Sequence, residues 1–431
     1  MDAINTSITQ LQLADTDQIG LIRKRCTDQG IVSVSEIAEA CEALRQKQVA
    51  AGLWCYENYT ESGSHSEGLV KSAASSASRH SVIWPINHYL GLNRHPEVIQ
   101  ATIQALQKYG TGCGTSAMSG GHNQLHKDLE HRLAHILRKE TAILFPTGYS
   151  ANLGAISGLT KGSDSFVLFD RECHASIIDG FRLSGCKFLP FRHNDMADLE
   201  EKLRNHSQNY ANVFVIVESV YSMSGKEAPL REIVQLKQRY PFYFFVDEAH
   251  AFGLYDVGGL CRKLGVSDEV DFVMTTFSKS TASIGGVVAT SRAFKSMLQV
   301  EASSHVFQAT LTPPDAATIL AALDVIEKTP ELVQSLWDKT AYLRQAFAQH
   351  GFDTGKGVSP IVPVYIRDSA TLLQMGREMF KHGIFTTAIT FPAVKHSEVR
   401  FRFIVNASHT YEQMDQTVAV MAELGKKFGV I

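Results

Sequence analysis

Short apolar runs alternate with helix-length segments of mixed polarity over residues 141–290 of this chain. Strands that alternate with helices of about ten residues indicate right-handed βαβ crossovers and a mostly parallel sheet. We expect strands over residues 142–145, 166–169, 188–191, 213–217, 242–246, 271–275 and 287–290. Helices are expected over residues 148–159, 175–183 and 230–239, with another that ends near Arg204.

Other patterns flank this block. Apolar residues at helical spacing predict a helix over residues 34–49, which Ser33 can cap. Residues 59–81 are rich in Ser, Gly and Ala, as is typical of a linker. A helix is expected over residues 96–109. Towards the C-terminus, one long helical stretch over residues 315–350 precedes strands over 361–366 and 399–405, with a helix over 372–381 between them.

These patterns predict three regions in an α/β protein. Residues 1–81 form an N-terminal extension or arm, residues 82–300 a large domain with a mostly parallel sheet, and residues 301–431 a connecting helix and a small α+β domain. We interpret the arm as a loosely packed extension, with a segment that binds a partner or docks on a membrane as the alternative. A chain of 431 residues is long enough for one large and one small domain.

Composition excludes several classes of protein. The hydrophobic content of 44% and charged content of 20% are those of a globular protein. A formal charge of -3 provides no basic field for nucleic acid. We expect no spanning helix and no signal peptide, since the chain has no apolar run near eighteen residues and no basic-then-apolar start. Seven scattered cysteines without a C-x-x-C pair indicate reduced thiols in the cytoplasm and no metal site.

Three chemically active side chains follow two of the predicted strands. Asp247 and His250 come directly after residues 242–246, and Lys279 follows residues 271–275. In open α/β sheets, chemistry gathers at the carboxyl ends of strands. An aspartate for a pyridine nitrogen and a lysine for a Schiff base are what a pyridoxal phosphate enzyme needs. From these residues alone, a surface lysine and an Asp-x-x-His quartet without function remain the alternative.

A glycine-rich loop occupies residues 110–121. So many glycines indicate a backbone that turns tightly or approaches another group closely. No clear strand precedes the loop, so it does not fit a dinucleotide fingerprint.

The order of the motifs resembles the α-oxoamine synthase family of fold-type I pyridoxal phosphate enzymes. The motifs are Asp247-Glu-Ala-His250, Thr276-Phe-Ser-Lys279 and Gly285-Gly286. The family includes serine palmitoyltransferase, glycine C-acetyltransferase, 8-amino-7-oxononanoate synthase and 5-aminolevulinate synthase, and the resemblance extends from about Asn87 to the C-terminus. It implies the fold-type I architecture and pyridoxal phosphate as the cofactor.

The resemblance also implies roles for the cofactor's neighbours. Lys279 carries the Schiff base, Asp247 keeps the pyridine nitrogen protonated, His250 lies beside it, and His174, in the motif His174-Ala-Ser-Ile-Ile-Asp-Gly180, stacks on the ring. Further cofactor contacts are expected from Gly148, Tyr149, Ser222 with Glu218 near it, Thr276 and Thr310.

Two of these contacts bear on the phosphate and on assembly. Gly148 and Tyr149 follow a strand where a helix begins, and a free helix N-terminus suits a phosphate. The segment with Thr310 resembles one that lends a hydroxyl to the partner subunit's phosphate, so a homodimer with a shared active site is implied. The role of His126, near the glycine-rich loop, stays open.

Two residues are expected to bind the amino acid. Asn87, in Asn87-His-Tyr-Leu-Gly-Leu92, resembles an asparagine near the substrate carboxylate. Arg400 and Arg402 alternate with apolar residues, so both point to one face of their strand. The family has its carboxylate-binding arginine at the second position, which implies Arg402, with a surface salt bridge as the alternative.

The implied reaction is the decarboxylative condensation of a small amino acid with an acyl-CoA or acyl carrier protein thioester. Lys279, once displaced by the amino acid, acts as the base, and the product is a 2-amino ketone. Residues 276–286 look most like serine palmitoyltransferases, whereas residues 179–183, 194–196 and 424–431 look more like glycine C-acetyltransferase. Serine or another small amino acid with a longer acyl chain is the favoured pair, and a glycine C-acetyltransferase or amino-oxononanoate synthase-like activity is the alternative. An aminotransferase or an aldolase-type lyase is the alternative of another class, while Lys279 argues against an inactive partner subunit.

Overall fold

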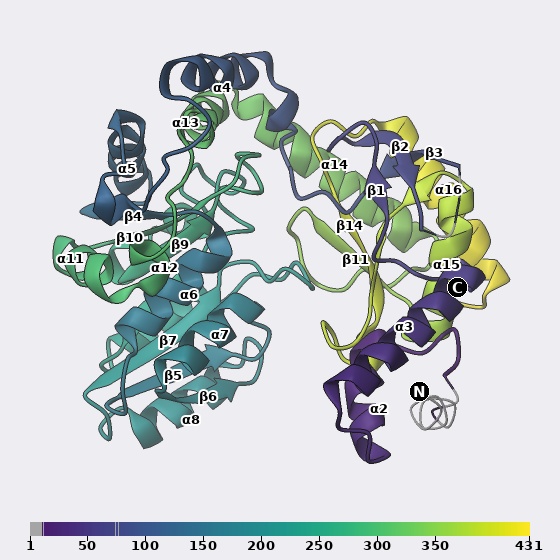
Figure 1. Ribbon diagram of the computed structural model, residues 1–431, viewed down its shortest axis with the longest axis horizontal. Helices are drawn as coiled ribbons and strands as arrows, with labels where there is room; N and C mark the ends of the chain where they lie inside the picture. The colour runs from purple at the N-terminus through teal and green to yellow at the C-terminus, as the bar shows by residue number, and fades with distance from the viewer. Residues whose placement is uncertain (1–10, 12, 74, 76) are drawn as a thin grey trace. The chain divides into compact units, whose positions relative to one another are not determined.

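The computed structural model describes residues 11, 13–73, 75 and 77–431, and the chain forms two compact units. The large unit is Asn87–Ser335, and the terminal unit combines the described residues up to Ile86 with Leu336–Ile431. The boundary falls within helix α14 (Pro330–Gln349) (Figure 1).

The large unit is built on a seven-stranded sheet with the strand order β4-β10-β9-β8-β7-β5-β6. β10 is antiparallel to both of its neighbours, and the other pairings are parallel. The mostly parallel sheet predicted from the sequence is therefore present (Figure 1). The strands are β4 (Thr141–Phe145), β5 (Ser165–Asp170), β6 (Lys187–Phe191), β7 (Asn212–Glu218), β8 (Tyr243–Asp247), β9 (Phe272–Thr276) and β10 (Gly286–Thr290).

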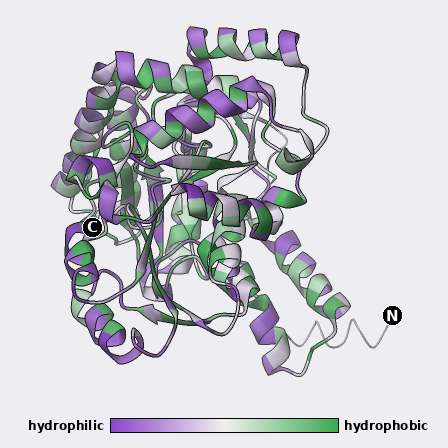
Figure 2. Ribbon diagram, turned by 90° about the vertical axis from the view of Figure 1, so that its left-hand side faces the viewer, coloured by the Kyte–Doolittle hydropathy of each residue, from purple (hydrophilic) through white to green (hydrophobic). Residues whose placement is uncertain are grey.

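The central strands are buried along their whole length. Every residue of β5, β9 and β10 is buried. The sequences of these strands are therefore mostly apolar and do not alternate between apolar and polar residues. The helices contain both hydrophilic and hydrophobic residues along their length (Figure 2). A core cluster that includes Phe145, Ile177 and Phe272 joins the sheet to α6 and α7.

The helices of the large unit are α4 (Pro96–Tyr109), α5 (Gln124–Ile136), α6 (Gly148–Leu159), α7 (Ala175–Ser184), α8 (Met196–His206), α9 (Leu230–Lys237), α10 (Leu260–Leu264), α11 (Arg292–Glu301), α12 (Ser303–Val306) and α13 (Pro313–Lys328). Helices α4, α6, α7, α8 and α9 lie close to their predicted positions, whereas α5, α10, α11 and α12 occupy segments for which no helix was predicted. The single helical stretch expected over residues 315–350 is wrong. It is two helices, α13 and α14, because Pro330 favours a helix start and disfavours helical backbone at Thr329 before it.

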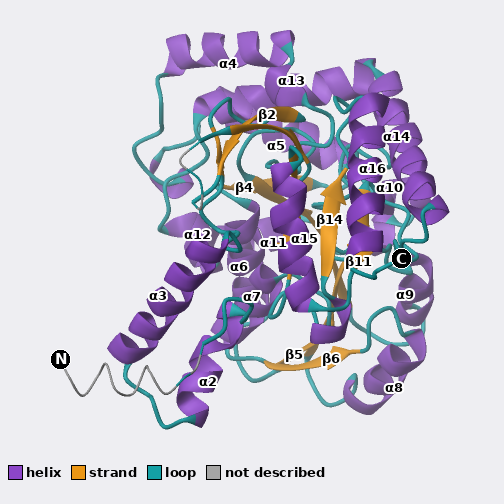
Figure 3. Ribbon diagram, turned by 90° about the vertical axis from the view of Figure 1, so that its right-hand side faces the viewer, coloured by secondary structure: helices purple, strands orange, loops and turns teal. Residues whose placement is uncertain are grey.

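The terminal unit contains two small sheets. One has the order β1-β2-β3-β12 and the other, fully antiparallel, the order β11-β14-β13. In Figure 3, α15 and α16 lie beside β11 and β14. The strands are β1 (Tyr59–Thr60), β2 (Glu67–Lys71), β3 (Arg79–Ile83), β11 (Ile361–Tyr365), β12 (Ile384–Phe385), β13 (Thr387–Ile389) and β14 (Arg400–Ile404); the helices are α2 (Ile22–Asp28), α3 (Val34–Ala51), α15 (Ser369–Lys381) and α16 (Tyr411–Lys427).

The linker expected over residues 59–81 is wrong. β1, β2 and the start of β3 lie in this segment, and β3 pairs in parallel with β12 from the C-terminal part of the chain. Val70 in β2 is fully buried. β1, β2 and β3 pair with one another in sequence order, and the small polar residues around these short strands conceal their alternation.

Among the described residues, no helix is long and apolar enough to span a bilayer. The same residues contain no group of three His, Cys, Asp or Glu side chains that could hold a metal ion.

Candidate active site

Polar residues end four neighbouring strands of the large sheet. Asp170, Glu218, Asp247 and Thr276 are the last residues of β5, β7, β8 and β9. The strand register places Glu218 opposite Asp247 and Thr276 opposite Gly286. Because these strands are parallel, their polar side chains lie together at the C-terminal ends of the strands, here called the C-terminal edge of the sheet.

Asp247 lies at the centre of this edge and is 4% exposed. Its Oδ2 accepts a hydrogen bond of 2.8 Å from Asn152 Nδ2, and its Oδ1 accepts one of 2.9 Å from the Ala249 amide. Asn152 Nδ2 also donates to Ser176 Oγ at 3.0 Å. A buried carboxylate held by neutral donors favours a cationic partner, because its charge has lost most of its hydration.

His174 completes this chain of hydrogen bonds. Its Nδ1 lies 2.8 Å from Ser176 Oγ and accepts from the Ser176 amide at 3.3 Å, so the neutral ring carries its proton on Nε2. The exposed side chain caps the start of α7. Partial desolvation by the surrounding protein lowers the pKa of His174, and the charge of Asp247 opposes this shift. Ser176 therefore orients the His174 ring, and Asn152 links Ser176 to Asp247.

Glu218 is a second buried carboxyl beside Asp247. It is 3% exposed, and its Oε1 accepts from the His174 amide. Burial, and then the charge of Asp247, raise the pKa of Glu218 well above its usual range. These two carboxyl groups in adjacent buried positions therefore have different hydrogen-bond partners.

Tyr89 and His250 form a buried pair. The Tyr89 hydroxyl lies 2.7 Å from His250 Nδ1, and both side chains are less than 9% exposed. Asn87, two residues before Tyr89, is half-buried, and its Oδ1 is buried with no hydrogen-bond partner among the described residues. An unsatisfied buried oxygen of this kind favours a donor from a bound molecule or water.

The start of α6 packs tightly against β9 and β10. A Cβ added to Gly148 would lie 2.6 Å from the Thr276 side chain, and one added to Gly286 would lie 2.8 Å from Gly148 Cα. Thr147 caps the helix by accepting from the Ser150 amide at 3.0 Å. The Gly148 and Tyr149 amides precede it in the first turn, where helical N–H groups have no partner within the helix. This turn is a ready anion site at the edge of the sheet.

The remaining predicted cofactor contacts lie in loops of the same unit. Lys279 is half-buried in the turn between β9 and β10, three residues after Thr276. Ser222 is buried in the turn after β7. The Tyr149 ring lies edge-on to His174 with the ring centres 6.2 Å apart, and its hydroxyl donates to Asp179.

Thr310 belongs to a different cluster. Its hydroxyl lies 3.1 Å from His122 Nε2, and His122 stacks on His126 with ring centres 4.7 Å apart. His126 Nε2 donates to the Leu311 carbonyl at 2.7 Å. Burial and the neighbouring His126 lower the pKa of His122 to about 4, so its ring is neutral near pH 7. The two histidines fix the backbone and hydroxyl of the Thr310 segment.

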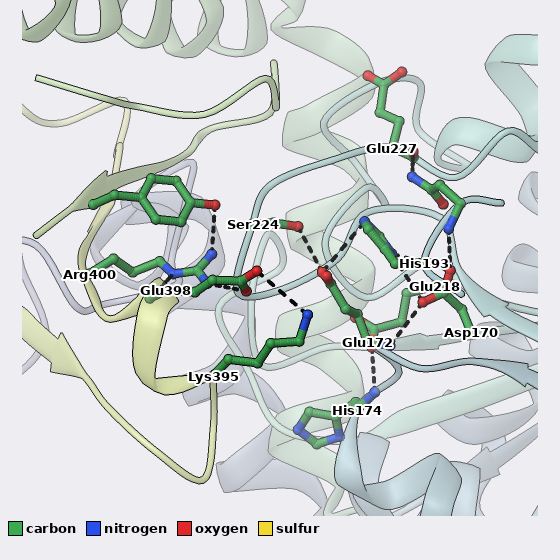
Figure 4. A network of polar contacts seen from close by, with 12 residues as sticks. Asp170, Glu172, His174, His193, Glu218, Ser224, Glu227, Lys395, Glu398 and Arg400 are labelled. Carbon is green, nitrogen blue, oxygen red and sulfur yellow. Dashed lines mark hydrogen bonds and ion pairs between the residues drawn. The ribbon is translucent and has the colours of Figure 1, made fainter. Parts of the chain in front are cut away.

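A second polar network fixes loops at the same edge of the sheet (Figure 4). Asp170, fully buried, accepts from the Glu172 amide at 2.9 Å, from His193 Nδ1 at 3.0 Å and from the Asn194 amide at 2.8 Å. Ser224 donates to Glu172 at 3.4 Å. These bonds hold the segments after β5, β6 and β7 in register with one another.

The two arginines of β14 belong to the terminal unit and differ in their surroundings. Arg400, 3% exposed, donates to the Glu398 carbonyl at 2.7 Å and to the Tyr365 hydroxyl at 2.8 Å (Figure 4). Its guanidinium also pairs with the Glu398 carboxylate at 3.3 Å. Arg402 is half-buried, with its backbone beside Pro363 and Thr387. Arg400 therefore has structural partners, and Arg402 keeps the role expected from the sequence as a prediction.

Three residues that sequence reasoning did not select lie in the hydrogen-bond networks. Ser176 and Tyr89 fall inside motifs already recognised, at His174-Ala-Ser176 and Asn87-His-Tyr89. Asn152 lies four residues into α6, and no sequence signal separates it from an ordinary helical asparagine. A polar residue on the buried face of a predicted helix could have pointed to it.

These features fit pyridoxal phosphate. The buried Asp247 carboxylate suits a protonated pyridine nitrogen, and the glycine-lined start of α6 suits a phosphate. Asn152 Oδ1 is buried without a hydrogen-bond partner among the described residues, so this oxygen can still accept a hydrogen bond from a bound molecule. Lys279 supplies the amine.

Residues 79–421 match the family model for aminotransferases of class I and II. A serine palmitoyltransferase from Bacteroides thetaiotaomicron is 37% identical over 390 residues, which cover 90% of this chain and 97% of the relative. An 8-amino-7-oxononanoate synthase from Alkaliphilus metalliredigens is 35% identical over 347 residues, covering 80% of this chain and 88% of the relative. A serine palmitoyltransferase structure with its pyridoxal phosphate internal aldimine superposes with a TM-score of 0.86 at 28% identity, over 93% of this chain and all of the other. These matches confirm the resemblance, the fold class, the enzyme class and the cofactor predicted from the sequence, and the chain belongs to the α-oxoamine synthases within the class I and II aminotransferase family, which are pyridoxal phosphate-dependent acyltransferases.

Proposed function

We propose that this enzyme condenses serine with a long-chain acyl thioester and releases carbon dioxide and the free thiol to form a 2-amino ketone. Four serine palmitoyltransferases, 36–39% identical to this chain over 80–90% of its length, support the substrate pair. The sequence around Lys279, which looks most like serine palmitoyltransferases, agrees with these matches.

The observation that carries the proposal is the buried carboxylate of Asp247 at the end of β8. Its Oδ2 accepts a hydrogen bond of 2.8 Å from Asn152 Nδ2. Such a carboxylate would keep the pyridine nitrogen of bound pyridoxal phosphate protonated, and this charge would let the cofactor serve as an electron sink for the amino acid's Cα. Gly148 and Tyr149 at the start of α6, with Thr276 and Ser222, would hold the cofactor. His174 would stack on its ring, in the orientation that Ser176 imposes.

Lys279 moves the proton in this proposal. Its amine anchors the cofactor, is released when the amino acid binds, and then takes the proton from Cα. The same amine returns a proton to Cα after carbon dioxide has left. His250 would lie beside the cofactor's pyridine ring, oriented by the Tyr89 hydroxyl at 2.7 Å.

Arg402 and Asn87 are proposed to bind the amino acid. A guanidinium forms paired hydrogen bonds with a carboxylate, which fixes the Cα substituents as well as the charge. The buried Oδ1 of Asn87, which has no hydrogen-bond partner among the described residues, would accept from the bound substrate.

A homodimer with a shared site is part of the proposal. Exposed apolar side chains flank the Thr310 cluster: Phe307 is 86% exposed, Met118 65% and Ile284 46%. Contact with a second copy would remove this apolar surface from water. Thr310 would then contact the phosphate bound by the partner. The seven free cysteines support a location in the cytoplasm.

An 8-amino-7-oxononanoate synthase-like activity is the second candidate. Relatives of that name are 34–37% identical over 80% of the chain, whereas the first serine palmitoyltransferase match covers 90%. The longer match favours serine palmitoyltransferase-like chemistry.

The test is a visible absorption titration of the purified enzyme with single amino acids, followed by acyl-CoAs of graded length while free thiol is measured. We expect serine to shift the cofactor band and long acyl chains to release CoA. A spectral response to amino acids without any need for a thioester would instead indicate an aminotransferase or a lyase. Lys279→Ala should abolish turnover and leave the far-ultraviolet circular dichroism unchanged.

A further inference from the structure

A cavity of about 420 Å³ lies within the terminal unit, and none of the residues assigned a role above lines it. The end of α3 and the segment after it form one wall, and α15 with β12 and β13 forms the other. A volume of this size is typical of sites for small organic ligands.

Part of the cavity lining is apolar. Leu53 and Ile384 are buried, and Phe380 lies edge-on to Phe385 with ring centres 6.2 Å apart. Leu373 adds a further apolar side chain. This lining suits a hydrocarbon chain, whose burial removes apolar surface from water.

The rim is cationic. Arg79, Arg377 and Lys381 line the cavity, and no acidic side chain does. The Arg79 guanidinium donates a hydrogen bond of 2.8 Å to the backbone carbonyl of Lys381. The bond keeps Arg79 close to the end of α15, where Lys381 lies. Glu378 pairs with Arg377 at 3.1 Å and with Lys381 at 2.9 Å, so one carboxylate offsets part of the charge of these two cations. The rim keeps an excess of positive charge, and Arg79 and Lys381 are exposed to solvent.

A donor also lines the cavity. Trp54 Nε1 is buried and has no hydrogen-bond partner among the described residues. Buried indole N–H groups usually have a partner, so a ligand oxygen would satisfy this one.

We propose that this cavity binds an amphiphile with an acyl chain and an anionic head. The chain would occupy the space among Leu373, Phe380 and Phe385, and a carboxylate or phosphate would meet Arg79, Lys381 and the Trp54 N–H. Guanidinium groups bind either head by charge-assisted hydrogen bonds. None of these residues belongs to the candidate active site, so the cavity does not depend on the proposed reaction.

Calorimetric titration of the cofactor-loaded enzyme tests the site with sodium dodecanoate, dodecyl phosphate and dodecanol, each below its micelle concentration. We expect both anions to bind saturably with one site per chain, and dodecanol at least tenfold more weakly. Tighter binding of the phosphate would identify a phosphorylated lipid as the source, and equal or tighter binding of dodecanoate a free fatty acid. Affinity should rise by up to about fourfold per added methylene until the cavity is full.

Variants place the binding in this cavity. Arg79→Gln and Lys381→Gln should each weaken anion binding by roughly tenfold, whereas Arg367→Gln, an exposed arginine paired with Asp353 in the same unit, should not. Trp54→Phe should remove the change in tryptophan emission that accompanies binding. Absence of saturable binding, equal affinity for dodecanol, or unchanged affinity in Arg79→Gln and Lys381→Gln would overturn the proposal, whatever the outcome for serine and acyl-CoA.

Discussion

At the scale of single residues, the candidate site depends on neutral hydrogen-bond donors. Asn152 uses both N–H bonds of one nitrogen, to Asp247 at 2.8 Å and to Ser176 at 3.0 Å. The same amide therefore orients the carboxylate and, through Ser176, the His174 ring. Asn152 therefore influences the site through Asp247 and Ser176.

Asn152→Ala should weaken retention of pyridoxal phosphate by roughly ten- to a hundredfold, because a hydrogen bond to a charged group is lost in a buried place. Cofactor affinity, measured from absorbance during dialysis, gives the result. Asn209→Ala is the matched control, since that amide donates to a carbonyl on the surface. Normal cofactor affinity in Asn152→Ala would show that Asp247 needs no help from it.

Tyr89→Phe should lower kcat by about tenfold, because His250 loses the hydroxyl that orients it. Steady-state kinetics with circular dichroism separates this effect from misfolding. Tyr342→Phe provides the control, since its hydroxyl donates to Asp415 on an exposed surface. If both variants have the same kcat as the parent, the Tyr89 hydroxyl serves stability alone.

At the scale of elements, the site depends on how closely α6 approaches the sheet. Gly148 and Gly286 lie so near Thr276 and Thr147 that a methyl group on either glycine would fall within 2.7 Å of a neighbouring atom. The start of the helix is therefore held against the ends of two strands. The proposed phosphate site at its amide groups therefore depends on this contact.

Gly148→Ala should weaken binding of pyridoxal phosphate far more than binding of pyridoxal, because the added methyl displaces the helix end that faces the phosphate. Paired titrations with the two aldehydes measure the difference. Gly112→Ala is the control, since a Cβ there meets nothing within 4 Å. An equal loss for both aldehydes would indicate general destabilisation.

His409 makes the stability of the terminal unit depend on pH. Its Nδ1 accepts from the Asn406 amide at 3.0 Å, its Nε2 donates to the Ile83 carbonyl at 3.1 Å, and its ring stacks on Trp84. Burial lowers the pKa of His409 from 6.5 to about 3. Because the folded pKa lies below the unfolded one, this contribution to stability is present above about pH 6.5 and is lost as the pH falls towards 3.

The free energy of unfolding should therefore fall by about 2 kcal/mol from pH 7 to pH 5 through His409 alone. Urea unfolding at both values measures it. His409→Gln should be less stable at pH 7 but show a smaller loss on acidification, because the amide does not titrate. A loss of the same size in the variant would assign the pH dependence to other groups.

At the scale of the whole molecule, the proposed dimer makes two chains share each site. Thr310 lies with His122 in a cluster separate from the hydrogen-bond chain that joins Asp247 to His174. A hydroxyl held there would serve the partner's cofactor. Loss of Lys279 and loss of Thr310 should then affect different sites of one dimer.

Mixing Lys279→Ala chains with Thr310→Asp chains should restore activity, because each mixed dimer then contains one intact site. Each parent variant alone should be inactive, the second because a carboxylate would repel the phosphate. Activity after the chains are unfolded and refolded together, compared with the two refolded separately, gives the result. No gain on mixing would show that Thr310 acts within its own chain.

The order of strands and helices in the large unit could be predicted because local patterns determine it. Residues 242–246 and 271–275 are apolar runs that end in Asp247 and near Lys279, and buried parallel strands leave such a pattern in any sequence. The motif order then identified the family and the cofactor. Local preference and short-range spacing were sufficient for these conclusions.

Only the tertiary structure showed that Asn152 holds Asp247, that residues 59–81 contain strands, and that a cavity with apolar and cationic lining residues lies between α3 and α15. The cavity and the Asn152 contact depend on residues far apart in the chain, since Asn152 needs the end of β8, 95 residues later. β1, β2 and β3 pair with one another, and β12 from the C-terminal part of the chain completes their sheet. Composition and periodicity record what a segment prefers by itself, whereas these features arise from the partner that the fold brings to it.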